Sequence, residues 1–364
     1  MSATRILMVG TSLDAPGGVA AVLRTWREAG LFERAGVRYV ATNDGAGPAA
    51  KALSALRAWL ACTAAMVSGR APLVHVHTSS YASFWRKTPV LACALLTGRP
   101  MVVSLHGGAF REFYAARSAL GRAWIRLVMR RAQRFVVLTS AWQRWAQEVE
   151  PHAHVRVIPN TVAPVVARPR VEADARGPLL FLGRIEPEKG LFVLLQALGR
   201  AHAAGAAWTL VCGGSGDLDG ARRAAAAAGL PDDAVQLRGW VSGDAKAQLL
   251  DDCELMVLPS LVENMPVALL EAFAHARPVI ATRVGGIPDM VTPGREGWLV
   301  GPGQVEELAA ALVEAWNDAP ARRERGIAAR ERFQRDFACD AVVARVEALY
   351  AECLGEARLE GCTP

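Results

Sequence analysis

The sequence predicts an α/β protein made of two doubly wound domains, each with a parallel sheet. Short runs of apolar, often β-branched residues alternate with alanine-rich stretches of helical length, and this alternation occurs in the front half of the chain and again in the back half. The chain has 364 residues, of which 52% are apolar, so it is long enough to bury two separate cores.

Strands are expected where the apolar runs are nearly continuous, because parallel strands are covered on both faces. In the front half these runs are RILMVG (5–10), PLVHVHT (72–78), MVVSLHG (101–107), RFVVLTS (134–140) and VRVIPN (155–160). In the back half they are PLLFLGR (178–184), WTLVCGG (208–214), AVQLRGW (234–240), ELMVLPS (254–260), PVIAT (278–282) and GWLV (297–300). Helices are expected between them, including 189–204, 243–252, 266–276 and 304–317, and a last helical pattern covers 340–355.

An aperiodic stretch rich in proline and charge separates the two halves. We therefore expect an N-terminal domain at 1–165, a linker at 166–177 and a C-terminal domain at 178–338. The remaining segment, 339–364, is expected to carry a helix that packs back toward the first domain. Ligands of such proteins bind outside the carboxyl ends of the strands, which predicts a site in the cleft between the domains.

Composition also bears on the compartment. No run of 18 uncharged apolar residues occurs, so no transmembrane span is expected. The chain enters RILMVG at once, which is typical of a first strand and not of a signal peptide. The seven cysteines are scattered without a C-x-x-C pair, as in a reduced cytoplasmic protein without a zinc site.

Charge is distributed unevenly along the chain. Residues 1–165 hold 20 lysines and arginines against 7 acidic residues, a balance of +13, whereas residues 166–364 have a balance of −7. A basic front half predicts an anionic partner, which could be membrane lipid, a phosphorylated acceptor or nucleic acid. Nucleic acid is not expected, because interleaved surface aromatics and a recognised binding motif are lacking.

One segment of this basic half resembles a lipid-binding helix. Arg122, Arg126, Arg130 and Arg134 recur every four residues in GRAWIRLVMRRAQR, with Trp124, Leu127 and Val128 elsewhere around the helix. Such a helix can lie on anionic lipid; the alternative is a solvated face over a core-packed stripe. The charge balance favours peripheral contact with the inner face of the cell membrane.

Two glycine-containing turns follow strands of the front half. In TSLDAPGGVAAV, Gly17 and Gly18 would let the backbone approach a ligand at a helix N-terminus, or they form an ordinary turn. In SLHGGAF, His106 ends a buried strand before two glycines. A lone histidine is often structural, but the Gly-Gly pair favours a functional position.

Three motifs of the back half follow strands in the same way. In LGRIEPEKG, Arg184 and Lys189 stand where a strand gives way to a helix, which predicts an anion site suited to a diphosphate. In LVENMPVALLEAFAHARPVIAT, Glu263 precedes a helix that is expected to start near Met265, and Glu271 lies in its second turn. The helix N-terminus can hold a phosphate, and Glu271 could accept hydrogen bonds from a vicinal diol such as a ribose. RVGGIPDMV (283–291) is a further turn at the same edge.

These motifs occur in the order and approximate spacing of one known family. The chain resembles the retaining family-4 glycosyltransferases, which have the GT-B fold, and the resemblance covers nearly the whole chain. Its most specific part is the E-x7-E element from Glu263 to Glu271. GRIEPEKG before it, VGGIPDMV after it, HGG and the N-terminal GGV agree with the same family.

The resemblance implies a role for each site residue. Arg184 and Lys189 would neutralise the diphosphate of a nucleotide-sugar donor, and Glu271 would bind its ribose. Glu263 would contact the sugar hydroxyls on the reacting face, and His106 would position the sugar. Further donor contacts would come from Gly17, Gly18, Gly239, Trp240, Val267 and Ala268.

The chain departs from the family pattern at three places. Thr161 follows Asn160 where the family often has glycine, and Ala276–Arg277 replaces glycine and an apolar residue. Asn264–Met265–Pro266 replaces the commoner Gly-Phe-Gly, and Pro266 lacks an N–H that could bind phosphate. No charged site residue is lost, so activity is expected.

The resemblance implies a retaining, metal-independent transfer of a sugar from a UDP- or GDP-linked donor to a hydroxyl of a glycan acceptor. We expect a lipid-linked acceptor in surface polysaccharide biosynthesis and no cofactor. No D-x-D motif stands at an expected strand end, where it could hold a metal, and Asp251–Asp252 lies within a helical stretch. The alternatives are a GT-B epimerase or phosphorylase with different catalytic residues, and a non-catalytic nucleotide-sugar-binding module. The sequence makes no prediction of the oligomeric state.

Overall fold

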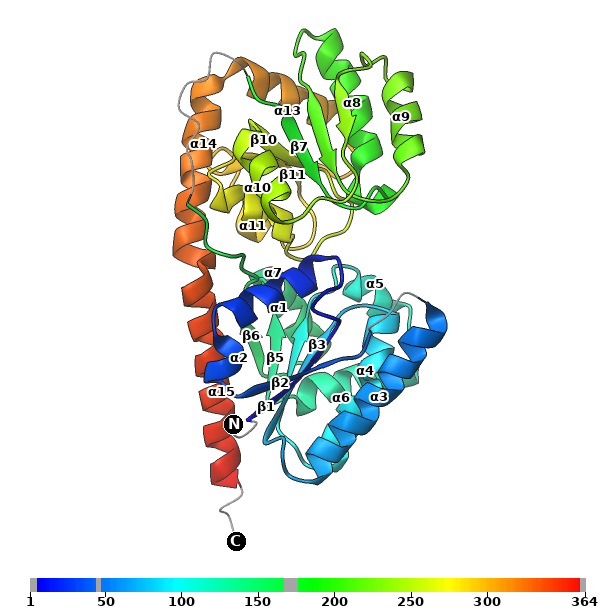
Figure 1. The fold of residues 1–364 in the computed structure, drawn as a ribbon, viewed down its shortest axis with the longest axis vertical. Helices are drawn as coiled ribbons and strands as arrows, with labels where there is room; N and C mark the ends of the chain where they lie inside the picture. Colours follow the sequence, from blue (N-terminus) through cyan, green and yellow to red (C-terminus); the bar gives the residue numbers. More distant parts are fainter. Residues whose placement is uncertain (1–4, 44–46, 167–175, 361–364) are drawn as a thin grey trace. The chain divides into compact units, whose positions relative to one another are not determined.

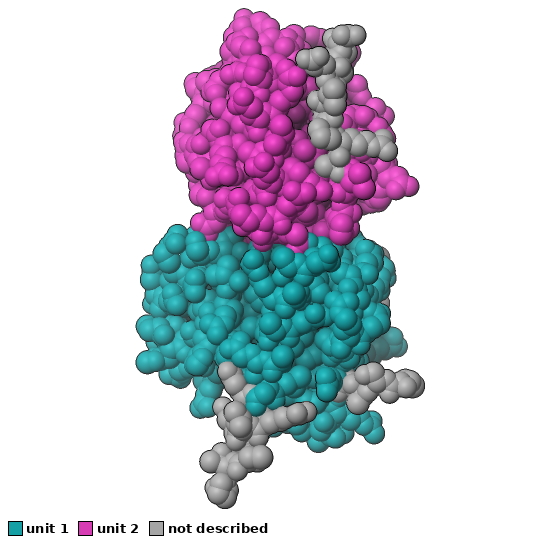
Figure 2. All heavy atoms as spheres, turned by 90° about the vertical axis from the view of Figure 1, so that its left-hand side faces the viewer, with its two compact units in different colours: residues 1–161, 339–364 teal, residues 162–338 magenta. Residues whose placement is uncertain are grey.

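The structure is a computed structural model that describes residues 5–43, 47–166 and 176–360. The chain divides into two compact units, coloured separately in Figure 2. Unit 1 comprises residues 1–161 and 339–364, and unit 2 comprises residues 162–338. The expected linker at 166–177 lies, except for its ends, outside the described residues.

Unit 1 is built on a parallel sheet whose strands, within the described ranges, are ordered β2-β1-β3-β4-β5-β6. The strand order reverses between β1 and β3, and ligands of doubly wound sheets bind outside the carboxyl ends of strands at such a point. The strands are β1 (Ile6–Gly10), β2 (Val37–Ala41), β3 (Leu73–Thr78), β4 (Met101–Leu105), β5 (Arg134–Val137) and β6 (Val155–Val157).

Helices cover both faces of this sheet. Figure 1 shows α3, α4 and α6 on one side and α1, α2 and α15 on the other. The described helices of the unit are α1 (Gly18–Glu28), α2 (Leu31–Arg34), α3 (Pro48–Val67), α4 (Ala82–Leu96), α5 (Phe110–Ala115), α6 (Ala119–Arg131), α7 (Ser140–Val149) and α15 (Cys339–Glu360). The last helix is tied to the sheet by a 2.6 Å hydrogen bond between the Tyr350 hydroxyl and His75 Nδ1.

One strand of unit 1 was not predicted. β2 lies at the edge of the sheet beside β1, and its residues are half-buried or exposed, including an exposed Arg38. An edge strand is not covered on both faces, so its sequence VRYVA lacks the continuous apolar run by which the other strands were found.

The prediction that Arg134 continues the basic helix was wrong. α6 ends at Arg131, and Arg134 begins β5, where it is buried. Its guanidinium forms an ion pair with Glu352 on α15, which also binds Arg156. The four-residue spacing therefore runs across a helix end into a strand, and a buried arginine can remain there because its charge is paired.

Helix α3 has an unusual composition. By length and composition alone, its residues Ala49–Val67 could cross a membrane, and this is the only such helix among the described residues. This differs from the expectation that no segment qualifies. However, Ala58, Cys62 and Met66 are buried in unit 1, so one side of α3 belongs to a protein core.

Unit 2 repeats the architecture with a parallel sheet whose strand order, in its described part, is β12-β11-β10-β7-β8-β9. This is the strand order of dinucleotide-binding doubly wound domains, and it reverses between β7 and β10. The strands are β7 (Leu179–Leu182), β8 (Leu210–Gly213), β9 (Val235–Leu237), β10 (Leu255–Leu258), β11 (Val279–Thr282) and β12 (Gly297–Val300).

The helices of unit 2 again cover both sheet faces. As described, they are α8 (Leu191–Ala203), α9 (Leu218–Ala227), α10 (Gly243–Asp252), α11 (Val267–Ala274), α12 (Ile287–Met290), α13 (Val305–Asn317) and α14 (Ala319–Arg332), with a 3₁₀ turn η1 (Pro187–Lys189) and a π turn η2 (Phe333–Phe337). The predicted α/β fold of two doubly wound parallel sheets is therefore confirmed.

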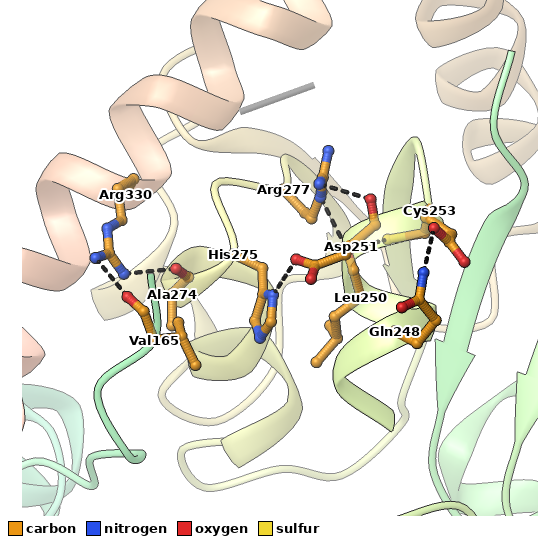
Figure 3. A network of polar contacts seen from close by, with 10 residues as sticks. Val165, Gln248, Leu250, Asp251, Cys253, Ala274, His275, Arg277 and Arg330 are labelled. Carbon is orange, nitrogen blue, oxygen red and sulfur yellow. Dashed lines mark hydrogen bonds and ion pairs between the residues drawn. The ribbon is translucent and has the colours of Figure 1, made fainter. Parts of the chain in front are cut away.

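A polar network holds α10, α11 and α14 together (Figure 3). The buried Arg277 donates to the carbonyls of Leu250 and Asp251, at 2.8 and 2.7 Å, and so satisfies the end of α10. His275 lies 2.7 Å from Asp251, and Arg330 of α14 donates to the Ala274 carbonyl. Arg277, which stands where the family has an apolar residue, therefore fixes α11 against its neighbours.

Candidate functional site

The loops after β7 and β10 meet at the point where the strand order of unit 2 reverses. Leu261 N–H donates to the Glu188 carbonyl at 2.8 Å, which joins the two loops. Gly190 has φ 76°, and a Cβ there would lie 2.0 Å from the Pro259 carbonyl oxygen. Only glycine permits this approach, so the GRIEPEKG motif is held against the residues before Glu263.

Two of the predicted site residues are in direct contact at this junction. Lys189 Nζ lies 2.5 Å from Glu263 Oε1, and Ser260 Oγ donates to the same oxygen at 3.0 Å. The Lys189 side chain is 26% exposed and that of Glu263 10%, so the pair is reachable from solvent but well shielded. Each charge compensates the other while no ligand is bound.

Arg184 takes a more open position in the same loop. Its side chain is 62% exposed and its guanidinium lies 2.8 Å from Glu186 Oε1. An exposed pair of this kind contributes little stability, so the guanidinium can exchange its partner at small cost. It therefore remains available to an anion at this edge of the sheet.

Helix α11 begins two residues later than expected. Pro266 is its N-cap, with extended ψ of 123°, and Val267 is the first helical residue. The first N–H groups of a helix have no acceptor within it, so Val267 and Ala268 present donors at the helix N-terminus. Because Pro266 lies before the helix, its missing N–H removes none of these donors.

Glu271 also has a partner, which the sequence did not reveal. Lys246 Nζ on α10 lies 2.5 Å from Glu271 Oε1, and the two side chains are 29% and 15% exposed. Glu271 Oε1 is therefore engaged in an ion pair inside the second turn of α11. Lys246 follows the Gly239–Trp240 turn by a few residues, but its pairing depends on packing between two helices and has no local sequence signal.

Two further loops complete this edge. Gly285, at φ 54°, would clash with the Glu263 carbonyl if it carried a Cβ, and Gly286 N–H donates to the Asn264 carbonyl at 2.8 Å. The VGGIPDMV motif thus supports the loop that carries Glu263. Gly239 has φ 67° and Trp240 is 51% exposed, so this turn presents a large aromatic side chain to solvent.

In unit 1, His106 lies at the end of β4 beside another histidine. His106 Nε2 is 2.9 Å from His77 Nδ1, and His106 Nδ1 is buried without a described hydrogen-bond partner. His77 is in turn 4.1 Å from His75 between ring centroids. A Cβ on Gly107 would lie 2.5 Å from Ser80 Oγ, so the first glycine of HGG lets the β4 loop pack on the β3 loop.

The histidine cluster formed by His75, His77 and His106 is electrically neutral near pH 7. Burial lowers the pKa of His75 to about 3 and that of His106 to about 4, and burial also holds the pKa of His77 well below its usual value. Nearby Lys87 has its pKa lowered to about 7 by burial. His106 therefore acts as a hydrogen-bonding group and not as a cation at neutral pH.

His106 and Asn160 line the same small pocket of unit 1, together with Trp26, His75 and Ser104. Thr161, the residue that replaces the family glycine, is fully buried. Gly17 is the N-cap of α1 with φ 126°, and Gly18 is the first residue of that helix. The helix therefore starts directly after the glycine turn, with its free N–H groups at the carboxyl edge of the sheet.

Of the four arginines predicted to lie on one basic helix, three lie on α6 and one does not. Arg122, Arg126 and Arg130 are exposed on the helix, whereas Arg134 belongs to β5. Arg126 is also paired with the buried Glu150 at 3.2 Å. Among the described residues, no group of three or more histidine, cysteine, aspartate or glutamate side chains is placed to hold a metal ion.

Family models match both units. The model described as Glycosyl transferase 4-like domain matches residues 2–161, and the one described as Glycosyl transferases group 1 matches residues 176–318. Together they cover the strands, loops and helices that carry the residues described above.

Individual proteins agree with this assignment. The chain is 29% identical over 318 residues to the 2-deoxystreptamine N-acetyl-D-glucosaminyltransferase of Streptomyces fradiae, covering 80% of this chain and 75% of that enzyme. It is 33% identical over 141 residues to the amylovoran biosynthesis glycosyltransferase AmsK of Erwinia amylovora, a match that spans 37% of this chain but only 35% of that relative.

A solved structure has the same fold. HepE from Anabaena, in complex with UDP, superposes with a TM-score of 0.73 over 96% of this chain and 100% of its own, at 17% identity. This likeness, with the two parallel sheets and the two matched family models, assigns the GT-B fold. The chain belongs to the group 1 family of glycosyltransferases.

Proposed function

We propose that this protein transfers a sugar from a nucleoside-diphosphate sugar to a hydroxyl of a glycan acceptor. The observation that carries the proposal is the meeting of Lys189, Glu263 and the α11 N-terminus at the strand-order reversal of unit 2. This edge combines two cations, free helical N–H groups and two carboxylates. Such a set suits a ligand that is anionic at its centre and rich in hydroxyls at both ends.

The donor residues have distinct proposed roles. Arg184, Lys189 and the N–H groups of Val267 and Ala268 bind the diphosphate and stabilise the charge that develops as it leaves. Glu271 accepts hydrogen bonds from the ribose hydroxyls, and Glu263 accepts them from the sugar. The exposed Trp240, beside Gly239, offers a surface for the base.

The residues of unit 1 act on the transferred sugar. His106 is neutral at pH 7 because burial lowers its pKa to about 4, so it can hydrogen-bond a sugar hydroxyl without adding charge. Gly17 and Gly18 allow the backbone of the α1 N-terminus to approach the diphosphate. We propose net retention, with attack on the anomeric carbon from the face of the leaving diphosphate, which takes up the acceptor proton.

No metal is needed in this scheme, because cationic side chains and helical N–H groups neutralise the diphosphate. HepE was solved in complex with UDP, which supports a uridine donor, and GDP-linked donors are the alternative. AmsK is described as an amylovoran biosynthesis enzyme, which supports an acceptor in surface polysaccharide synthesis. We propose a lipid-linked acceptor, met in the cytoplasm at the inner face of the cell membrane, because the front half is strongly basic.

Thermal unfolding against UDP, GDP, ADP and their sugars tests the donor site. A ligand at 100 times its dissociation constant adds about 2.7 kcal/mol to the free energy of unfolding. One nucleotide series should raise the melting temperature, and Glu271→Ala should abolish the rise. The absence of a shift with every nucleotide would contradict the donor reading.

Product analysis separates the remaining alternatives. NMR of the product should show the anomeric configuration of the donor, and an inverted linkage would exclude the retaining mechanism. Turnover of the nucleotide sugar without acceptor would favour an epimerase, and phosphate-dependent turnover a phosphorylase. Binding without turnover of any kind would favour a non-catalytic donor-binding module.

A further inference from the structure

Helix α3 exposes a row of large aliphatic side chains. Leu53, Leu56, Leu60 and Val67 are 47%, 48%, 63% and 68% exposed, and we call these four residues the α3 stripe. Their spacing of three, four and seven residues places them on one side of the helix. The opposite side, with Ala58, Cys62 and Met66, is buried in unit 1. The helix is thus apolar on both sides, although only one side has a protein partner among the described residues of unit 1.

A single exposed leucine on a soluble protein needs no explanation, but a contiguous apolar row does. Exposure of the α3 stripe to water is unfavourable, because its side chains are apolar. The only charged residues of α3 within its described length are Lys51 and Arg57. Helix α4 packs beside α3, because Trp59 of α3 donates to the Arg86 carbonyl of α4 at 2.8 Å. Trp85 of α4 is also partly exposed and packs against Phe113 of α5.

The charge around the stripe identifies the class of partner. Residues 45–147 contain fourteen lysines and arginines and a single acidic residue, Glu112. This segment includes α3, α4 and α6, which lie on the same side of the sheet (Figure 1). Trp124 of α6 donates to Thr88 of α4 at 3.3 Å, so α6 packs beside α4 in the same helical layer. The exposed Arg122, Arg126 and Arg130 lie on the side of α6 away from that contact. The excess of positive charge of the front half therefore lies in the segment that carries the α3 stripe, although two of the fourteen cations, Lys87 and Arg134, are buried and Arg134 is paired with Glu352.

We propose that the α3 stripe is a membrane-docking surface that inserts its aliphatic side chains into the interface of an anionic lipid bilayer. α3 lies in the plane of the interface and does not cross the bilayer, because its other side is part of the protein core. The arginines of α6 and Arg57 contact lipid phosphates, while the aliphatic chains enter the boundary of the acyl region. A second copy of this chain is a poorer occupant, because face-to-face pairing would bring two cationic layers together.

This inference rests on the proposed function and extends it, because a lipid-linked acceptor would require the protein to bind the membrane. It differs from the sequence-based expectation in assigning the insertion to α3 and only the electrostatic contact to α6. Donor binding in unit 2 does not depend on it. The UDP-induced thermal shift of each variant therefore reports on the donor site separately from membrane binding.

Vesicle sedimentation tests the proposal. The intact chain is mixed at low salt with vesicles of phosphatidylcholine containing phosphatidylglycerol, and with vesicles of phosphatidylcholine alone. The double variant Leu56→Gln/Leu60→Gln removes apolar surface without changing charge. Ile327→Gln is the matched control, because Ile327 is 54% exposed on α14 of unit 2. All variants are checked by thermal unfolding, and exposed substitutions should change stability by less than about 0.5 kcal/mol.

The wild type should bind the anionic vesicles and should bind phosphatidylcholine alone much more weakly. The double variant should lose roughly tenfold or more in partitioning, and Ile327→Gln should bind like the wild type. Unchanged binding of the double variant, or equal binding to both vesicle types, would overturn the proposal. A wild-type dimer in light scattering that is lost in the double variant would also overturn it, because the stripe would then contact a second copy of the chain.

Discussion

At the scale of single residues, each acid of the E-x7-E element has its own lysine. Lys189 pairs with Glu263 and Lys246 pairs with Glu271, so neither partly buried carboxylate is left alone in the free protein. Leaving a partly buried charge uncompensated would cost several kcal/mol, roughly 3–5 for a fully buried one. If Lys189 binds the donor diphosphate as proposed, that diphosphate would share Lys189 with Glu263, and the recognition of phosphate would be coupled to that of the sugar.

Replacing Lys189 should weaken donor binding through the diphosphate. Lys189→Met keeps much of the side-chain volume and removes the charge, and loss of a charge-assisted hydrogen bond of about 1.5–3 kcal/mol corresponds to a rise in dissociation constant of about 10- to 100-fold. Titration calorimetry should detect this rise for the nucleoside diphosphate and little change for the free nucleoside. Equal weakening of both ligands would point to a general distortion of unit 2, and Lys189→Arg should restore part of the affinity.

Lys246 should affect the ribose end of the donor. In Lys246→Met, Glu271 loses its partner in a shielded position, and we expect unit 2 to lose about 1 kcal/mol of stability. Donor affinity should also fall, by roughly 3- to 10-fold, because the variant removes a cation beside Glu271, the carboxylate proposed to bind the ribose. Lys246→Arg should show smaller effects on both. A variant with wild-type affinity and stability would mean that the Lys246–Glu271 pair has no part in the site.

The sequence revealed some of these residues and missed others for a physical reason. Glu263, Arg184 and Lys189 follow strands whose carboxyl ends meet at one edge, so their convergence could be predicted from the strand pattern alone. Lys246 and His77 act through contacts with residues 25 and 29 positions away, made by the packing of separate elements. No local spacing encodes such a contact.

At the scale of elements, the proposed donor site of unit 2 depends on the loops after β7 and β10, which pack backbone to backbone. Gly190→Ala should lower the stability of unit 2 by about 3 kcal/mol or more and weaken donor binding, because its Cβ would meet the Pro259 carbonyl at 2.0 Å. Gly205→Ala is the control, since Gly205 also has positive φ, 87°, but has no atom within 4 Å of the added Cβ. That variant should lose only about 1 kcal/mol, the strain of the left-handed conformation.

Denaturant unfolding with and without UDP measures both glycine variants. Similar losses in the two would mean that conformation alone matters at Gly190 and that the junction of the β7 and β10 loops can relax. A selective loss in Gly190→Ala would confirm that this junction holds Lys189 against Glu263.

The end of α11 offers a change of opposite sign. Ala276 has φ 55°, a conformation that favours glycine, and the family usually has glycine at this position. Ala276→Gly should therefore raise the free energy of unfolding by about 0.5–1 kcal/mol. Ala204→Gly, at the end of α8 with φ −89°, should instead lower it by a similar amount. If Ala276→Gly is no more stable than the wild type, the contacts of Arg277 and His275 already compensate the strain.

Element boundaries were predicted where packing and sequence agree. Strands buried on both faces were found as apolar runs, and the edge strand β2 was missed because it is half-exposed. The four-residue recurrence of arginine predicted one helix, but Arg134 pairs with Glu352, which is 218 residues later in the chain. Periodicity describes one element at a time, and it cannot distinguish an exposed arginine from a buried one whose partner comes from α15.

At the scale of the whole molecule, the two units carry different acid sensitivities. Unit 1 buries His75 and His77 and shields His106, while unit 2 has no comparable histidine cluster among its described residues. The cluster is faced by Lys87, Ser104 and Tyr350, and none of these groups is a carboxylate that could stabilise a protonated ring. Charge on the cluster is therefore opposed by burial and by its neighbours.

Unit 1 should consequently lose stability on mild acidification before unit 2 does. The unfolded chain binds protons on these histidines near pH 6.5, whereas the folded unit binds them only near pH 4 for His106 and pH 3 for His75. In between, the unfolded state holds more protons, so the free energy of unfolding falls as the pH falls.

Calorimetry at pH 7.5, 6.5 and 5.5, values chosen to span about one pH unit on either side of the ordinary histidine pKa, should show one transition moving to lower temperature more steeply than the other. Gly190→Ala identifies the unit 2 transition, and His77→Asn should reduce the pH dependence of the unit 1 transition. Two transitions with equal pH dependence would mean that the histidine cluster does not control the acid response of unit 1.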